Sequence, residues 1–339
     1  MNRNNAMKDI HDYSLKQHNT FGIEARCDRF LEYSTADEAK AVADILRQSA
    51  QPFLIIGGGS NLLLTQDFKG IVVRSAIKGI TPQKDTLRCG SGEVWDDVVD
   101  YSVKHGYYGM ENLSWIPGDV GASAVQNIGA YGVEVKDFIE TIEAIEIASG
   151  ALQLIDAAAC RYAYRQSRFK GEWKNQYLIT HVTYRTQRDF QPKLDYGNIR
   201  SELERRNMTH PTASQLREVI IGIRQEKLPD PAVMGNAGSF FMNPIVERSQ
   251  YEALASQYEN MPHYTIDANH EKIPAGWMID QCGWKGRTVG HAGVHDRQAL
   301  VLVNRGNATG QEIVDLCRMI QRDVKEKFGI TIKPEVNII

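Results

Sequence analysis

Two glycine-rich segments carry the residue types that could hold a phosphate group or a planar ligand. The first, Gly57-Gly58-Gly59-Ser60-Asn61, follows a short apolar stretch, and such a turn can point several backbone N–H groups at a phosphate with no Cβ in the way. The second runs from Gly118 to Gly132 and mixes four glycines with small and polar residues. It could lie flat against a nucleotide-like cofactor. Tight turns without a ligand use the same residues, so on spacing alone both interpretations stay open.

Neither glycine segment matches a standard nucleotide-binding fingerprint. In the pattern G-x-G-x-x-G the third glycine would fall on Leu62, and strand-like residues follow where a helix should begin. The sequence also contains no G-x-x-x-x-G-K-[ST] loop. We therefore do not expect a Rossmann or a P-loop nucleotide site.

Three further side chains could transfer a proton or stabilise charge. Arg165 lies among aromatic residues in Ala163–Phe169, where an arginine ordinarily packs or forms an ion pair. Ser239 lies in 235–244, which is not a G-x-S-x-G elbow, and no capable His and Asp partners are evident, which disfavours a Ser-His-Asp hydrolase. Glu335 follows a proline near the end of the chain, a pattern typical of edge-strand protection. Taken singly, each residue has a structural explanation.

Hydrophobic periodicity and capping patterns predict the elements that position these residues. Thr35-Ala36-Asp37-Glu38 is a capping-box pattern, and apolar residues then recur at helical spacing through Leu46. Leu228-Pro229-Asp230-Pro231 ends a later helix, because proline cannot continue the hydrogen-bond ladder. The predicted strands are 53–56, 62–64, 71–74, 142–148, 152–155, 177–186, 299–303 and 331–339, and the predicted helices begin near 36, 93, 212, 249, 274 and 309. We expect the main domain boundary near Pro231.

The composition excludes several classes of protein. The chain has 339 residues, with 39 Lys and Arg against 42 Asp and Glu, a formal charge of −3, and 42% hydrophobic residues. This length allows two or three domains, and a near-neutral charge without a run of Lys or Arg disfavours nucleic acid as a partner. The longest apolar run, 299–303, is far shorter than the ~20 residues of a membrane span, and the first residues lack a signal-peptide core.

The cysteines and histidines do not form the pattern of a metal site. The five cysteines are scattered, odd in number and without a C-x-x-C pair, so we expect reduced thiols and a cytoplasmic location. The nine histidines contain no H-E-x-x-H or H-x-H pattern, and His291 and His295 lack an acidic ligand in their motif. We therefore expect no bound metal. The cysteines are Cys27, Cys89, Cys160, Cys282 and Cys317.

The glycine segments resemble the FAD-binding loops of one flavoenzyme family. Ile56–Leu63, Ile116-Pro117-Gly118 and Gln126–Gly132 are similar to those of the UDP-N-acetylenolpyruvoylglucosamine reductases, also called UDP-N-acetylmuramate dehydrogenases. The resemblance extends from about Tyr13 to Ile339. It implies an α+β fold, with a two-part FAD-binding region of the vanillyl-alcohol-oxidase type and a C-terminal α+β substrate-binding domain. The implied segments are 1–68 and 69–226 for FAD, 227–330 for substrate, and 331–339 as a C-terminal strand.

The resemblance assigns cofactor contacts to residues of both glycine segments. The implied FAD-binding residues are Gly57, Gly58, Gly59, Ser60, Asn61, Leu62, Ile116, Pro117, Gly118, Ser123, Gln126, Asn127, Gly129, Ala130, Tyr131 and Gly132. NADPH is the implied second cofactor. We expect backbone amides of the loops and a few Lys or Arg side chains to bind these diphosphate ligands. The net charge of the whole chain does not reveal such local groups.

The resemblance also assigns substrate contacts. The implied residues are Tyr164, Tyr196, Lys227, Asn243 and Gln298. Tyr196 matches the tyrosine loop that covers the nucleotide sugar in the first of two family types, and Lys227 could bind diphosphate as a compact point charge. Met242 stands where better-known members have lysine, which puts a cationic contact there in doubt.

The implied reaction is the NADPH-dependent, FAD-mediated reduction of UDP-N-acetylglucosamine enolpyruvate to UDP-N-acetylmuramate, a step in peptidoglycan precursor biosynthesis. In the family pattern Arg165 and Glu335 stabilise the enolate that follows hydride transfer, and Ser239 protonates it as a general acid. We expect ping-pong kinetics and a monomer with no nucleic-acid or membrane partner.

Two alternatives belong to other functional classes. A flavin oxidase of the same fold would use O₂ and would need a different substrate domain, against which the 235–244 segment argues. A non-catalytic nucleotide-sugar binder would keep Lys227 and Gln298 but would have no use for Arg165, Ser239 and Glu335. Yellow flavin absorbance of the purified protein separates the binder from both enzymes.

Overall fold

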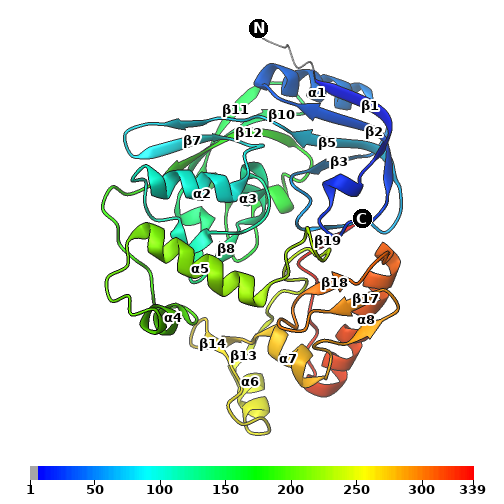
Figure 1. The fold of residues 1–339 in the computed structure, drawn as a ribbon. Helices are drawn as coiled ribbons and strands as arrows, with labels where there is room; N and C mark the ends of the chain where they lie inside the picture. Colours follow the sequence, from blue (N-terminus) through cyan, green and yellow to red (C-terminus); the bar gives the residue numbers. More distant parts are fainter. Residues whose placement is uncertain (1–6) are drawn as a thin grey trace. The chain divides into compact units, whose positions relative to one another are not determined.

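The computed structural model describes residues 7–339, which fold into two compact units (Figure 1). Each unit is assembled from segments that are far apart in the sequence. Within the described residues, unit 1 comprises 7–14, Arg26–Gly58 and Phe68–Gln225, and unit 2 comprises Leu15–Ala25, Gly59–Asp67 and Glu226–Ile339. The first glycine segment is therefore divided, because the unit boundary passes between Gly58 and Gly59. The four segments implied by the resemblance stay a prediction.

The first sheet of unit 1 has the strand order β1-β2-β5-β3 and mixes an antiparallel pair with parallel ones. The helix α1 (Ala36–Gln48) buries an apolar face of Ala39, Val42 and Leu46. The predicted capping is confirmed, since the Thr35 side chain accepts the backbone N–H of Glu38. The strands are β1 (Lys8–Ser14), β2 (Arg26–Tyr33), β3 (Phe53–Ile56) and β5 (Phe68–Ser75).

The second sheet of unit 1 is antiparallel and has the order β11-β10-β12-β7-β6. The strands predicted at 142–148 and 152–155 form a hairpin here, with Gly150 at φ +73° in the turn between them. Helices α2 (Trp95–Lys104) and α3 (Val120–Gln126) share one apolar core with this sheet. The strands are β6 (Ile80–Pro82), β7 (Thr86–Gly90), β10 (Ile139–Glu146), β11 (Leu152–Asp156) and β12 (Tyr177–Arg185).

Two helices complete unit 1. Helix α5 (Ala213–Lys227) buries Leu216, Ile220 and Ile223 in a small core shared with α4 (Ile199–Arg205). Its end agrees with the prolines at 229 and 231. The remaining short elements are the strands β8 (Gly129–Ala130) and β9 (Val133–Glu134) and the 3₁₀ turns Glu111–Leu113, Val135–Asp137, Ala157–Cys160 and Arg168–Lys170.

Unit 2 is organised around α8 (Gly310–Phe328), whose apolar face forms the centre of its core. A capping box joins Thr309 and Glu312 at the start of this helix, and Gly329 ends it at φ +68°. The other helices are α6 (Arg248–Ala255), α7 (Ala275–Gln281) and the 3₁₀ turn Lys16–His18. The strands are β4 (Leu62–Leu63), β13 (Ile245–Glu247), β14 (Tyr264–Thr265), β15 (His270–Lys272), β16 (Thr288–Val289), β17 (Ala292–Val294), β18 (Leu302–Asn304) and β19 (Asn337–Ile338).

The structure corrects two predicted strands and adds a helix that the sequence did not predict. Of the predicted strand 299–303 only the last two residues lie in a strand, β18 (Leu302–Asn304). The second glycine segment contains the helix α3, because its small residues allow close packing: a Cβ on Gly121 would lie 3.1 Å from the Cβ of Ser91. The predicted strand 331–339 is wrong for most of its length, since only Asn337–Ile338 pairs in a ladder, parallel to β4. Pro334 has no N–H to donate, and it forms an isolated bridge with Phe241.

Two further findings concern the cysteine thiols and the apolar length of the helices. All five cysteines are free thiols, and four of them are buried. Among residues 7–339, no helix is long and apolar enough to cross a membrane.

Candidate functional site

The two glycine segments meet within unit 1. A Cβ on Gly57 would lie 2.9 Å from the Cβ of Ala122, and one on Gly58 would lie 3.3 Å from the Cα of Gly118. The approach is therefore too close for larger residues at Gly57 and tight at Gly58. The contact brings the start of the first segment against the second, as two loops of one ligand site require.

The start of α2 holds the second segment in place. The Trp95 N–H donates to the Gly118 carbonyl at 2.9 Å, and the Val120 N–H donates to the Glu93 carbonyl at the same distance. The Gly121 N–H donates to the Ser91 carbonyl at 2.8 Å. Backbone bonds from residues before and within the first turn of α2 thus fix the loop that carries Pro117 and Gly118.

Three predicted FAD residues of the second segment differ in what their side chains do. Ser123 and Asn127 are buried and bonded within unit 1: Ser123 Oγ lies 2.9 Å from Tyr184 Oη, and Asn127 Nδ2 donates to Glu134 and to the Ala163 carbonyl. Gln126 Oε1 is also buried, but among residues 7–339 it has no hydrogen-bond partner. An unpaired buried acceptor costs about 1–3 kcal/mol, so Gln126 is suited to a donor on a ligand.

Arg165 lies against the end of the same segment. Its Nη2 donates to the Gly129 carbonyl at 2.7 Å and its Nη1 to the Asn127 carbonyl at 3.4 Å. Its own φ is +55°, and its guanidinium carbon lies 5.1 Å from the centre of the Tyr164 ring. The structure therefore brings two predicted site residues, Arg165 and Tyr164, to the predicted cofactor loop.

Tyr196 joins this group from a later loop. A Cβ on Gly132 would lie 3.3 Å from the Cβ of Tyr196, so the two residues are in direct contact. Asn112 is buried and donates to the carbonyls of both Tyr131 and Lys193 at 3.0 Å, which ties the Tyr196 loop to the cofactor segment.

In unit 2, the structure brings Ser239 close to Glu335 in space. The Glu335 N–H donates to the Phe240 carbonyl at 2.8 Å, directly beside Ser239. Asn61 Nδ2 donates to the Glu335 carbonyl at 3.3 Å. Three distant segments of the chain thus meet at these residues. The next backbone hydrogen bond between the same two segments joins the Met242 N–H to the Lys333 carbonyl at 2.9 Å.

The predicted substrate residues of unit 2 gather partly at α7. Asn243 Oδ1 accepts the Ala275 N–H at 2.9 Å. A Cβ on Gly276 would lie 3.1 Å from Gln298 Oε1, so both side chains reach the first turn of this helix. Lys227 is exposed at the end of α5.

The structure adds residues that the sequence did not single out. Arg224 faces the Tyr131 phenol, and burial lowers the pKa of its guanidinium, an effect that Tyr131 opposes and the nearby Arg165 charge reinforces. Asp119 is buried against Gly58, and burial raises the pKa of its carboxyl, although Arg74 and Lys78 oppose the shift. For Arg224 the sequence did contain a signal, because it lies three residues before Lys227 on the same predicted helix.

The match of one segment to a family model places the chain in a class, the FAD-binding flavoproteins. Residues 28–155 match the family described as "FAD binding domain". Residues 230–339 match the family described as "UDP-N-acetylenolpyruvoylglucosamine reductase, C-terminal domain". The chain belongs to the UDP-N-acetylenolpyruvoylglucosamine reductase family.

Relatives of that name match the chain along almost its whole length. The chain is 53% identical to the UDP-N-acetylenolpyruvoylglucosamine reductase of Bacteroides fragilis strain YCH46 over 334 residues, which are 96% of this chain and 99% of that protein. It is 42% identical to the enzyme of that name from Burkholderia multivorans over 338 residues, 97% of each chain. A crystal structure of the reductase from Thermus caldophilus has a TM-score of 0.67 at 22% identity, covering 98% of each chain, and shows the same fold.

The predicted family, the α+β fold class and FAD as cofactor are confirmed by these matches. The residues present also fit FAD, since Gly57 and Gly58 let the two glycine segments approach closely and Gln126 Oε1 has no hydrogen-bond partner among residues 7–339. Among the described residues there is no cluster of three or more His, Cys, Asp or Glu side chains that could hold a metal ion. The roles of single residues stay predictions.

Proposed function

We propose that this protein reduces UDP-N-acetylglucosamine enolpyruvate to UDP-N-acetylmuramate, with NADPH as reductant and FAD as cofactor. The observation that carries the proposal is the 53% identity to a reductase of that name over 96% of the chain. The reaction is a step in the synthesis of peptidoglycan precursors. Both family models lie in the expected order, FAD binding before the reductase C-terminal domain.

FAD would be held by the residues of the two glycine segments, from Gly57 to Leu62 and from Ile116 to Gly132. Bound FAD supplies the hydride chemistry, for which no side chain of the protein is suited. The close approach of Gly57 to Ala122 supports this assignment, because it brings the two glycine segments together, and backbone N–H groups without a Cβ in the way suit a diphosphate. The Gln126 acceptor supports it independently.

Arg165, Ser239 and Glu335 are proposed to act on the enolpyruvyl group. Arg165 carries a fixed positive charge that stabilises negative charge on the substrate carboxylate and the developing enolate. Glu335 is proposed to stabilise that enolate together with Arg165, and Ser239 to give a proton from Oγ to its carbon. The backbone bond between Glu335 and Phe240 supports joint action of Ser239 and Glu335, since it holds their two segments together.

The substrate contacts are proposed for Tyr164, Tyr196, Lys227, Asn243 and Gln298. Asn243 and Gln298 are supported by their shared position at the start of α7. Lys227 is exposed and would supply positive charge to a diphosphate. We also propose that the protein is a monomer. The five free, scattered cysteines support a cytoplasmic location.

Two half-reactions followed by flavin absorbance test the proposed function. Under anaerobic conditions NADPH is expected to bleach the absorbance, and UDP-N-acetylglucosamine enolpyruvate to restore it. Restoration by O₂ alone, with none by the UDP-sugar, would support a flavin oxidase. A purified protein that binds no FAD would contradict both enzyme functions and leave a nucleotide-sugar binder.

A further inference from the structure

The turn at Trp115 has a backbone conformation that other residues must hold in place. Its φ is +57°, in the left-handed region that residues with a Cβ rarely adopt. Trp115 directly precedes Ile116-Pro117-Gly118, the predicted FAD loop. The dihedral angles at Trp115 therefore set the direction in which that loop leaves.

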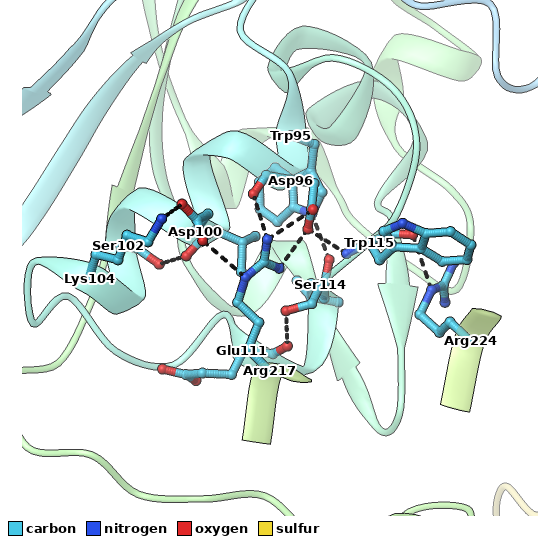
Figure 2. A network of polar contacts seen from close by, with 12 residues as sticks. Trp95, Asp96, Asp100, Ser102, Lys104, Glu111, Ser114, Trp115, Arg217 and Arg224 are labelled. Carbon is cyan, nitrogen blue, oxygen red and sulfur yellow. Dashed lines mark hydrogen bonds and ion pairs between the residues drawn. The ribbon is translucent and has the colours of Figure 1, made fainter. Parts of the chain in front are cut away.

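Charged side chains bind both polar groups of the Trp115 backbone. Its N–H donates to Asp96 Oδ1 at 2.5 Å, and its carbonyl accepts Arg224 Nε–H at 3.1 Å. Asp96 belongs to the first turn of α2 and Arg224 to α5. Figure 2 shows both contacts, one on each side of the turn. The strained residue is thus held between two helices.

Asp96 is itself fixed by Arg217. Arg217 Nη1 and Nη2 donate to the two carboxylate oxygens of Asp96 at 2.7 and 2.9 Å, and its Nε lies 3.5 Å from Asp100 Oδ1 (Figure 2). A two-point fork fixes orientation as well as charge. Burial opposes ionisation of Arg217, but the hydrogen bonds and charges of Asp96 and Asp100 outweigh it and raise the pKa, so the guanidinium stays charged.

Arg217 and Arg224 act from one face of α5. They are at positions i and i+7, two helical turns apart, and both point from the helix toward the segment that carries Trp115 (Figure 2). Arg224 also interacts with Tyr131 and lies in the field of Arg165, two residues predicted for the site. The Arg224 guanidinium is held in position by the hydrogen bonds that its nitrogen atoms donate. The Trp115 carbonyl accepts one of these bonds, from Arg224 Nε.

We propose that Asp96 and Arg217 are positioning residues for the FAD-binding unit. The pair fixes the turn at Trp115, and through the Trp115 carbonyl it holds Arg224 beside Tyr131. Neither residue needs to touch a ligand. The inference rests on the proposed function, because it takes Ile116–Gly118 and Tyr131 as FAD contacts. Without the pair, Trp115 relaxes out of the left-handed region, and the loop and Arg224 move together.

Two conservative variants test the pair. Asp96→Asn keeps an acceptor for the Trp115 N–H but removes the charge that Arg217 binds, and Arg217→Lys keeps the charge but removes the fork. Each is expected to raise the FAD dissociation constant of the apoprotein about tenfold. Because residues of one network are not additive, the double variant is expected to have a dissociation constant no higher than that of the single variant that binds FAD more weakly. Titration of flavin fluorescence measures the constant, and the absorption band of bound FAD is expected to shift in each variant.

The ion pair between Arg88 and Glu143 provides a matched control. It is also a two-point fork in unit 1, at 2.5 and 2.6 Å, and joins the strands β7 and β10. Arg88→Lys is expected to lower the thermal unfolding midpoint of the apoprotein about as much as Arg217→Lys, but to leave the FAD dissociation constant within twofold. Equal weakening in both variants, or none in Arg217→Lys, overturns the inference.

The outcomes also separate this inference from the proposed function. A wild-type protein that binds no FAD contradicts the proposed function, whatever the variants do. If Arg217→Lys does not fold, the FAD dissociation constant of Asp96→Asn tests the inference instead. If neither variant folds while Arg88→Lys does, the pair has a purely structural role and the inference is wrong.

Discussion

The Glu335 backbone N–H donates to the Phe240 carbonyl oxygen at 2.8 Å, so the residue next to Ser239 is bonded to Glu335 itself. The Met242 N–H donates to the Lys333 carbonyl at 2.9 Å, and together the two bonds make the segments antiparallel. Two residues that the sequence separates widely thereby lie on neighbouring backbone segments of unit 2. The pairing depends on the backbone, so side-chain substitutions at Ser239 leave it in place.

Ser239→Ala is expected to separate the two half-reactions. The variant keeps the backbone pairing and the FAD loops, so bleaching by NADPH stays near the wild-type rate. Restoration by the enolpyruvyl substrate is expected to slow by about 10²- to 10⁴-fold, because a positioned general acid contributes on that scale. Stopped-flow absorbance measures both rates.

The control is Ser256→Ala, which removes an exposed hydroxyl of unit 2 that donates to the Ala253 carbonyl. It is expected to leave both rates unchanged. Equal slowing of bleaching and restoration in Ser239→Ala would remove Ser239 from its proposed role.

Gly57→Ala is expected to weaken FAD binding. The added Cβ would lie 2.9 Å from the Cβ of Ala122, closer than such atoms ordinarily approach, so the two loops must separate. Overpacking of this kind costs about 1–3 kcal/mol in stability. We expect about a tenfold higher FAD dissociation constant, measured by flavin fluorescence on titration of the apoprotein.

Gly171→Ala serves as the control for that substitution. Its added Cβ would meet nothing within 4 Å, and because its backbone (φ −123°, ψ −106°) is unfavourable for a residue with a Cβ, the substitution is expected to strain only its own turn. FAD affinity is expected to stay at the wild-type value. A Gly57→Ala protein with unchanged affinity would contradict the assignment of the first glycine segment to FAD.

The sequence predicted the regular elements well, because capping and apolar spacing are local signals. Thr35, Gly150 and Gly329 mark the ends of elements in the structure as their types suggest. It failed at 331–339, where proline and pairing with a distant segment decide the conformation, and at α3, where glycine content concealed a helix that packs closely on Ser91.

The candidate site was predictable only as far as motifs reach. Arg165, Ser239 and Glu335 came from a family pattern, and their neighbours in space could not be inferred from spacing. Arg224 and Asp96 were missed because each has an ordinary helical position in the sequence, and only the strained Trp115 between them shows what they hold.

Glu32 and Asp119 are expected to respond to pH with opposite sign. They flank Arg74, whose Nη1 lies 2.9 Å from Glu32 Oε2 and whose Nη2 lies 3.7 Å from Asp119 Oδ2. Burial opposes ionisation of both carboxyls. At Glu32 the charges of Lys8 and Arg74 outweigh burial and lower the pKa, whereas at Asp119 burial prevails and raises the pKa.

The sign follows from linkage. A lowered pKa adds stability above the ordinary value of 4.5 for Glu32, and that stability is lost as the pH falls below it. A raised pKa makes stability fall as the pH rises above the ordinary value of 3.8 for Asp119. Glu32→Gln is therefore expected to lower the free energy of unfolding at pH 7, and Asp119→Asn to raise it.

Both effects are expected to fade toward pH 4 and below. Urea unfolding of the apoprotein between pH 3.5 and 8 measures them. If Glu32→Gln and Asp119→Asn changed the free energy of unfolding in the same direction at pH 7, the opposite pKa shifts of the two carboxyls would be contradicted.

Asn112 is expected to act on substrate binding through the Tyr196 loop. Its Nδ2 donates to the carbonyls of Tyr131 and Lys193, and each such bond contributes about 0.5–1.5 kcal/mol. In Asn112→Ala the loop loses this tie, so we expect about a tenfold higher KM for the UDP-sugar with kcat and NADPH bleaching little changed. Steady-state kinetics measure KM and kcat separately.

The control is Ser201→Ala, which removes an exposed hydroxyl that donates to the nearby Asn198 carbonyl and should change neither constant. A fall in kcat at constant KM would mean that Asn112 supports the reacting groups and not the loop.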